Sequence, residues 1–223
     1  MTGTDTGVGK TAVACALLRA FAGAGKSAVG MKPVAAGSEA GHRADVEALA
    51  GASTVRVPVD LANPYAFEPA IAPHIAADLA GVRIEIETIA RAYAGLSRRA
   101  EVVVVEGVGG FLVPLNARET GADLAKRLAL PVVLVVGMRL GCLNHALLTA
   151  TAIRAAGLPL AGWVANSATH EMPAFEANVA TLDERIDAPR LGLLPWLGAQ
   201  PDVAVAASHL DLSLLPGMPH ARV

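Results

Sequence analysis

A glycine-rich segment that ends in Gly-Lys-Thr stands near the beginning of the chain, at Gly3–Thr11. It leads directly into an alanine- and leucine-rich stretch that predicts a helix. The backbone amides of such a loop and the helix N-terminus bind phosphate groups, the lysine contacts the β- and γ-phosphates, and the threonine hydroxyl binds Mg²⁺. The segment therefore predicts a phosphate-binding loop with Lys10 and Thr11 in these roles. Its spacing departs from the usual pattern, because one more residue than usual separates the outer glycines.

Two further charged residues follow apolar stretches that predict buried strands. Lys32 ends such a stretch just before Pro33, and Glu106 comes directly after the four valines of Val102–Val105. The carboxyl ends of strands in a parallel sheet face the ligand crevice, so both side chains are expected beside the phosphate loop. A carboxylate at this edge suits Mg²⁺, which is held by few protein carboxylates together with water and phosphate oxygens. Asp45, at the start of a predicted helix, is a further candidate, although an acid there is also a common surface feature.

Two other segments carry candidates for ligand contacts. The apolar segment Gly162–Asn166 predicts a strand that ends in an asparagine, whose amide has the donor and the acceptor needed to pair with an adenine edge. The turn Arg139–His145 leads into a predicted helix, so its backbone amides form a second candidate anion site. The histidines show no spacing typical of metal ligands, and His145 is interpreted as a helix residue rather than a catalyst.

These residues must be positioned by short β-branched stretches that alternate along the chain with alanine- and leucine-rich ones. The expected strands are Ala28–Val34, Val102–Glu106, Val132–Val136, Leu160–Asn166 and Arg190–Leu194. The expected helices are Lys10–Ala24, Arg43–Ala50, Ile84–Ser97, Gly121–Ala129, Asn144–Ala156 and Met172–Ile186. The pattern predicts one α/β domain of the P-loop NTPase type over residues 1–223, with a doubly wound, mostly parallel sheet and helices on both faces. Val57–Pro73 is expected to be a loop, and residues 204–223 a loosely ordered end.

Composition excludes several classes of function. The chain has 223 residues, a net charge of −2 and only 4% aromatic residues, which argues against a nucleic-acid-binding protein. Its longest apolar run, Leu128–Met138, is shorter than the ~20 residues of a membrane span. No signal-peptide pattern opens the chain. The two cysteines, Cys15 and Cys142, form no disulfide framework, so the reducing cytoplasm is the expected compartment.

Taken in order, the motifs resemble those of dethiobiotin synthetases along essentially the whole chain to about residue 202. The matching segments are Gly3–Thr11, Lys32–Ser38, Ala72–Ile75, Val105–Gly110, Leu140–His145, Gly162–Asn166 and Pro195–Leu197. The resemblance implies an ATP- and Mg²⁺-dependent ligase of biotin biosynthesis. In this reaction diaminopelargonate and CO2 form a carbamate, ATP converts it to a carbamic–phosphoric anhydride, and the neighbouring amine closes the ring with release of ADP and phosphate.

The same resemblance assigns roles to individual residues. Lys10 and Lys32 are catalytic, and Thr11, Asp45 and Glu106 hold Mg²⁺. The implied ATP contacts are Thr6, Gly7, Val8, Gly9, Lys10, Thr11, Ala12, Asp45, Glu106, Gly107, Val108, Gly109, Asn166, Ser167, Pro195, Trp196, Leu197 and Asp202. The implied substrate contacts are Thr6, Lys32 and Ala36, together with Gly141, Cys142, Leu143 and Asn144 from the second subunit of a homodimer. The chain departs from the family at Gly7, Ala36 and Asn178, where a glutamate, a serine and a tyrosine respectively can occur.

Two alternative functions remain open at this point. One is another amide-forming P-loop ligase, similar to cobyric acid synthase, but such enzymes carry an added glutaminase domain for which 223 residues leave no room. The other is a P-loop switch protein of the partition-ATPase type. Those proteins carry a signature lysine five positions before the loop lysine, where this chain has Asp5.

The beginning of the chain leads to one more expectation. Only Met1 and Thr2 precede Gly3, whereas an ordinary strand has about 5–6 residues. Members of the family have an apolar strand at this place that ends in Val-Thr-Gly. We therefore expect a truncated first strand, either because the true start lies upstream of Met1 or because the chain is short. We also expect the chain as printed to be less stable, or to bind ATP more weakly, than an extended one.

Overall fold

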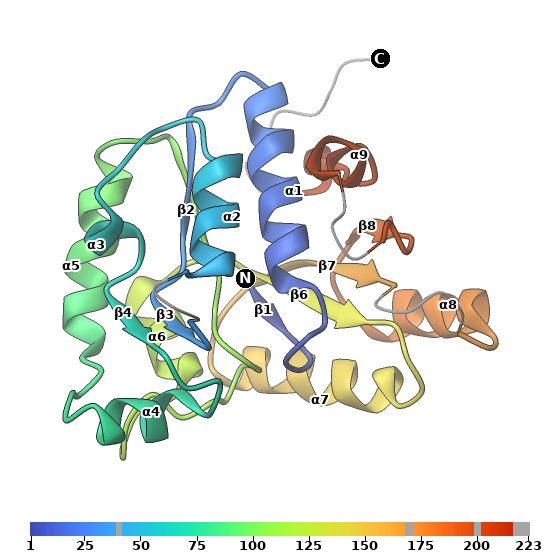
Figure 1. Ribbon diagram of the computed structural model, residues 1–223. Coiled ribbons are helices and arrows are strands. Elements are labelled where there is room, and N and C mark those ends of the chain that lie inside the picture. The colour runs from blue at the N-terminus through green and yellow to red at the C-terminus, as the bar shows by residue number, and fades with distance from the viewer. Residues whose placement is uncertain (39–41, 168–171, 199–201, 216–223) are drawn as a thin grey trace.

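The computed structural model describes residues 1–38, 42–167, 172–198 and 202–215, and it has parallel strands flanked by helices (Figure 1). All strand pairs among the described residues are parallel. One group of strands has the order β1-β6-β7-β8, with β1 at Thr2–Gly3, β6 at Val132–Gly137, β7 at Leu160–Asn166 and β8 at Arg190–Leu194. Two further pairs are β2 (Ala28–Met31) with β5 (Val102–Val105), and β3 (Val34–Ala36) with β4 (Tyr65–Phe67).

Helices cover both faces of the strands, as the sequence predicts. Figure 1 shows α1 (Lys10–Gly23), α2 (Ala44–Ala52) and α9 (Val203–Ser208) on one side. On the other side lie α6 (Gly121–Leu128), α7 (Cys142–Ala155) and α8 (Phe175–Arg185). Strand β6 shows why both sides must be covered, because Val133 and Val135 pack in the core with α1 while Leu134 and Val136 pack in the core with α7. A third apolar cluster joins β2 and β3 to α4 (Pro73–Leu79) and α5 (Ile86–Ser97).

The first strand is short, as expected, and it joins two groups of strands. Thr2 and Gly3 pair with Leu134 and Val135 of β6. On the other side, the amino group of Met1 donates to the carbonyl of Val105 at 2.6 Å, and the amide of Gly107 donates to the carbonyl of Met1 at 3.0 Å. The phosphate loop that follows β1 therefore starts between the carboxyl ends of β5 and β6.

The structure corrects several sequence-based expectations. The strand expected at Ala28–Val34 divides into β2 and β3, because Pro33 has no amide hydrogen to continue a ladder and the chain changes partner from β5 to β4. The loop expected at Val57–Pro73 contains α3 (Val59–Ala62) and β4. Residues expected to form a loose end include α9 and a 3₁₀ turn at Leu212–Leu214, while residues 216–223 lie outside the described part of the chain.

Helix boundaries agree with the predictions to within three residues at each end. The largest shift is in α8, which begins at Phe175 rather than Met172 because Ala174 stands before it in a left-handed conformation. Helix α7 begins two residues earlier than expected, after Gly141 with φ +94°, so Cys142, Leu143 and Asn144 form its first turn. Within the described ranges, no helix has both the length and the apolar character needed to cross a membrane.

Candidate functional site

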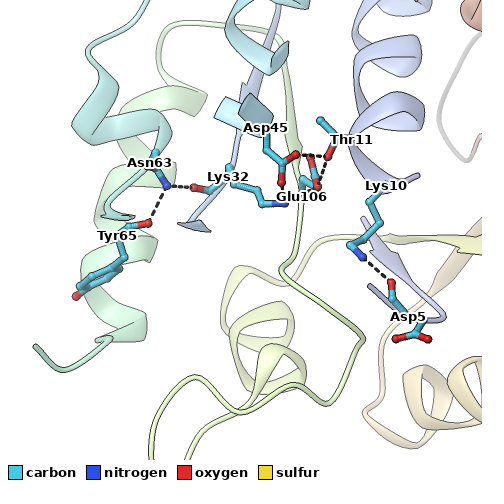
Figure 2. Close-up of polar contacts among 8 residues, drawn as sticks. All are labelled: Asp5, Lys10, Thr11, Lys32, Asp45, Asn63, Tyr65 and Glu106. Carbon is cyan, nitrogen blue, oxygen red and sulfur yellow. Dashed lines mark hydrogen bonds and ion pairs between the residues drawn. The ribbon is translucent and has the colours of Figure 1, made fainter. Parts of the chain in front are cut away.

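The loop between β1 and α1 has the conformation of an anion-binding turn. Gly7 and Gly9 have φ values of +73° and +86°, a backbone conformation that other residues adopt at a cost. Among the described residues, no side chain caps the start of α1, and its first turn holds no acid. Its first amides therefore remain free for a negatively charged ligand. The ammonium of Lys10 donates to the carbonyl of Asp5 at 2.8 Å, so the lysine lies folded along this loop (Figure 2).

Beside the loop, Lys32 lies between two carboxylates (Figure 2). Its ammonium is 2.7 Å from Oδ2 of Asp45 and 2.5 Å from Oε1 of Glu106. The hydroxyl of Thr11 is 2.9 Å from Oδ1 of Asp45 and 2.9 Å from Oε1 of Glu106. The Lys32 and Glu106 side chains are buried, with 5% and 1% of their surface exposed, whereas 46% of the Asp45 side chain is exposed. Residues from four separate segments of the chain thus meet in one cluster.

Burial and charge act in opposite directions on the pKa values of Lys32 and Asp45, and in the same direction on that of Lys10. Burial alone would lower the pKa of Lys32, but the charges of Glu106 and Asp45 outweigh it and raise this pKa. Burial would raise the pKa of Asp45, and the Lys32 charge lowers it below its ordinary value. Burial, supported by the positive charge of Lys32, lowers the pKa of Lys10. Lys32 is therefore held as an ammonium and Asp45 as a carboxylate at neutral pH.

The oxygen atoms of this cluster fit a magnesium ion. Oε2 of Glu106 is buried and has no hydrogen-bond partner in the described part of the protein, which leaves one acceptor free for a cation. Among the described residues, no three histidine, cysteine or acidic side chains are placed so that they could hold a metal ion. The oxygen donors of this cluster are two carboxylates and the Thr11 hydroxyl. Such a hard, oxygen-only and incomplete set is typical of Mg²⁺ sites completed by phosphate oxygens and water.

Eleven of the sequence-predicted residues line one open cleft of about 1380 Å³. The phosphate loop contributes Thr6, Gly7, Gly9, Lys10 and Thr11. The strand ends and the loops that follow contribute Lys32, Ala36, Asp45, Glu106, Val108 and Gly109. The same cleft also contains residues that the sequence analysis did not assign to the site, namely Ala70–Pro73 and Val113. The family motif Ala72–Ile75 overlaps this segment at Ala72 and Pro73, so a signal was present, but the added residues that line the cleft are all apolar.

A second pocket of about 560 Å³ adjoins the first through Gly7 and Gly9. The predicted nucleotide residues that line it are Ala12, Asn166, Ser167, Pro195, Trp196 and Leu197. The side-chain amide nitrogen of Asn166, Nδ2, donates to the carbonyl of Val8 at 2.9 Å. This bond connects the end of β7 to the phosphate loop. Gly9 makes this approach possible, because a Cβ atom there would lie 2.1 Å from Nδ2 of Asn166.

The remaining predicted residues lie away from the two pockets. Val8 is buried beneath the loop, and Gly107 lines a separate apolar cavity beside Met1. Asp202 accepts hydrogen bonds from the amides of Ala204 and Val205 and so caps α9. The turn Gly141–Asn144 contributes to neither pocket. Like α1, α7 begins after a glycine, with no side-chain cap from the described residues and no acid in its first turn.

Known proteins resemble this chain over nearly its whole length. The AAA domain family matches residues 1–200. The ATP-dependent dethiobiotin synthetase BioD of Nitrosospira multiformis is 60% identical, over 88% of this chain and 87% of that protein. The protein of the same name from a Janthinobacterium species is 52% identical, over 99% of this chain and 97% of that protein. That of Ralstonia nicotianae is 51% identical, over 96% and 95% respectively.

Solved structures show a similar fold at low identity. The cell division protein MinD of Aquifex aeolicus superimposes with a TM-score of 0.54 at 16% identity, over 99% of this chain and 89% of that one. The cell division protein FtsY of Thermotoga maritima superimposes with a TM-score of 0.51 at 16% identity, over 91% and 61% respectively. These structures confirm the parallel P-loop fold, while the sequence relatives carry the information on activity.

Proposed function

The chain belongs to the ATP-dependent dethiobiotin synthetase family, and from this premise we propose that the cleft around Lys10, Lys32 and Glu106 is where it forms dethiobiotin. The observation that carries the proposal is the convergence of Lys32, Asp45, Glu106 and Thr11 beside an uncapped helix N-terminus. In this proposal residues 1–223 act as one ligase domain. Neither alternative function is supported, because the relatives at 48–60% identity all carry the synthetase name.

ATP binds along the phosphate loop with its base in the adjoining pocket. The amides at the start of α1 receive the phosphates, and Lys10 leaves the carbonyl of Asp5 to contact the β- and γ-phosphates. Asn166 uses one amide hydrogen on Val8, and its carbonyl oxygen and second hydrogen can pair with the adenine edge. Support for this arrangement comes from the continuity of the two pockets through Gly7 and Gly9.

The reaction joins CO2 to diaminopelargonate in three steps. One amine attacks CO2 and loses a proton to give a carbamate. A carbamate oxygen then attacks the γ-phosphorus of ATP, the bond between that phosphorus and the β-phosphate oxygen breaks, and ADP leaves. The second amine attacks the carbonyl carbon of the anhydride, phosphate leaves with the bonding electrons, and loss of a proton completes the ureido ring.

The residues of the cleft lower the barrier by positioning and by charge. The transferring phosphoryl group and the carbamate are both negative, and Lys10 and Lys32 provide fixed positive charges toward them. Ala36 contacts the substrate through its backbone alone, because it has no hydroxyl. Thr11, Asp45 and Glu106 are the residues that would hold Mg²⁺, which when bound neutralises charge on the phosphate oxygens.

The substrate carboxylate binds at the start of α7 in the partner subunit of a homodimer. Two observations support this part of the proposal: the helix start is uncapped, and Leu140 beside it is 96% exposed, as expected of a residue that a second copy covers. Mixing Lys32→Ala and Asn144→Ala subunits tests it. Shared sites would restore about one quarter of the wild-type activity, since half of the dimers would be mixed and one site in each would be intact. No restoration, or an active monomer in light scattering, would contradict it.

The activity is tested by following ADP, phosphate and dethiobiotin together. We expect the release of ADP to require both diaminopelargonate and bicarbonate, with one dethiobiotin formed for each ADP. ATP hydrolysis that is independent of both compounds, and that membrane vesicles or a protein partner stimulate instead, would favour a switch protein over the ligase.

A further inference from the structure

Asn63 is a buried polar residue outside the cleft, with 3% of its surface exposed. It lies between α3 and β4, and its side chain makes three hydrogen bonds, of which Figure 2 shows the two to Lys32 and Tyr65. Nδ2 donates to the carbonyl of Lys32 at 2.7 Å and to the carbonyl of Tyr65 at 2.9 Å. Oδ1 accepts from Nη1 of Arg43 at 3.0 Å. From this geometry we infer that Asn63 is a positioning residue that fixes Lys32 relative to Asp45, an inference that rests on the proposed function.

The backbone of Lys32 is held by the turn that contains Asn63. The ladder between β2 and β5 ends with the amide of Glu106 donating to the carbonyl of Met31 at 2.8 Å. Beyond it, the amide of Lys32 donates to the carbonyl of Ala62 at 2.8 Å, and its carbonyl accepts from Asn63. Both backbone polar groups of Lys32 are therefore held by residues 62 and 63 rather than by β5. The direction of the Lys32 side chain depends on this attachment.

The Asn63 side chain also holds the start of α2. Arg43, which Asn63 binds, is the residue immediately before this helix, and Asp45 is the second residue within it. The opposite ends of one carboxamide thus hold the segments that carry Lys32 and Asp45. Those two side chains meet at 2.7 Å. A small movement of either segment would change this distance, and displacements of about 1 Å in a reactive site can cost roughly 100-fold in rate.

The hydrogen bonds made at residue 63 match an asparagine side chain. The site requires two donors on one side and an acceptor on the other, which a carboxamide supplies. Asn63→Asp keeps the acceptor for Arg43 and removes both donors. Arg43→Met removes the contact at the other end and leaves the Lys32 contact in place. Asn63→Asp therefore tests the contact with Lys32, and Arg43→Met tests the contact with the segment that carries Asp45.

The experiment compares these variants in the full-length protein. We expect Asn63→Asp to lower kcat by about 10–100-fold, as is typical when a supporting hydrogen bond behind a reactive group is lost, with little change in KM for ATP. We expect Arg43→Met to retain most of kcat at saturating Mg²⁺ but to raise the half-saturating Mg²⁺ concentration by about 10-fold. Calorimetry of ADP binding with and without Mg²⁺ gives a second readout, in which Arg43→Met loses the Mg²⁺-dependent part.

Thr54→Val is the matched control. Thr54 also fastens β2 through its side chain, accepting from the amide of Ala28 at 2.8 Å, but at the end of the strand away from Lys32. We expect it to lower Tm without lowering kcat. If Asn63→Asp is unfolded at the assay temperature, Asn63→Ser replaces it, because serine removes the carboxamide without adding a charge. The same kcat and KM measurements are then made on Asn63→Ser.

The outcomes separate the inference from the proposed function. Wild-type kcat in the Asn63 variant, or losses of kcat that follow Tm equally in the Asn63 and Thr54 variants, would overturn the positioning inference. A wild-type protein that forms no dethiobiotin would instead overturn the proposed function, whatever the Asn63 variant does. Dethiobiotin formation by the wild type, together with the split between kcat and Mg²⁺ dependence, supports both.

Discussion

The ammonium of Lys32 lies 2.5 Å from a carboxylate oxygen of Glu106, although the two residues are 74 positions apart in the chain. The register of β2 and β5 explains this contact. Met31 is paired with Val105, so the next residue of each strand, Lys32 and Glu106, comes to the same edge. With Asp45 on its other side, the ammonium occupies the place between two carboxylates where a metal cation would bind. Under the proposed magnesium assignment, Lys32 and Mg²⁺ would therefore compete for the same two carboxylate groups.

This competition predicts how Lys32→Met responds to Mg²⁺. Removal of the ammonium leaves Glu106 buried without its partner, a change that typically costs roughly 3 kcal/mol or more, so we expect a lower Tm without metal. Mg²⁺ should then raise Tm by more than in the wild type, since no ammonium has to be displaced. Thermal melts across a Mg²⁺ titration measure both effects, with Lys26→Met, at a surface ion pair, as control. Equal Mg²⁺-induced shifts in all three proteins would contradict the competition.

The two lysines of the cleft are expected to be needed for turnover. Replacing Lys10 or Lys32 by alanine should lower kcat by roughly 10²–10³-fold, because in the proposed reaction each provides a fixed charge for the transferring phosphoryl group. Lys32→Arg should also lower kcat strongly, since a planar guanidinium does not replace a compact ammonium in a closely packed site. Steady-state rates of dethiobiotin formation test this, and Lys126→Ala on α6 serves as a control. A Lys32→Ala enzyme with nearly normal turnover would disprove the assignment.

Gly9→Ala is expected to weaken nucleotide binding strongly. The new Cβ atom would meet Nδ2 of Asn166 at 2.1 Å and would force the phosphate loop and the end of β7 apart. Gly157→Ala is the matched control, because Gly157 has a similar φ of +75° but nothing within 4 Å of the added carbon. Isothermal calorimetry with ADP should show a large loss of affinity for the first variant and none for the second. Comparable affinities would show that the contact with Asn166 is unimportant.

Glu101 predicts a dependence of stability on pH. Hydrogen bonds from Lys26 and from Ser27 lower the pKa of Glu101 from 4.5 to about 2. A carboxyl whose pKa is lower in the folded state stabilises the fold fully above pH 4.5, and this contribution disappears as the pH falls toward about 2. Glu101→Gln should therefore lower Tm at pH 7, and the difference from the wild type should shrink in acid. Melts between pH 7 and pH 3 measure it, and a pH-independent difference would argue against the ion pair.

Much of the site follows from the sequence because its signals are local. Gly-Lys-Thr at a helix start, a lysine before a proline and a glutamate after four valines each indicate chemistry within a few residues. The parallel fold follows from the same stretches, since uninterrupted valines require burial on both faces. The prediction of a loop at Val57–Pro73 is wrong because this segment contains α3 and β4, which are only four and three residues long. Elements that short depend on tertiary contacts rather than on their own periodicity.

The sequence by itself determined which residues form much of the candidate site, namely the phosphate loop, Lys32, Glu106 and Asn166. Only the tertiary structure decided their relationships. The register of β2 against β5 places Lys32 on Glu106, and the carboxamide of Asn63 connects Lys32 to Arg43, two residues before Asp45. Local patterns do not encode such contacts, because a strand's pairing register and a buried amide's partners are set by packing between segments distant in the chain.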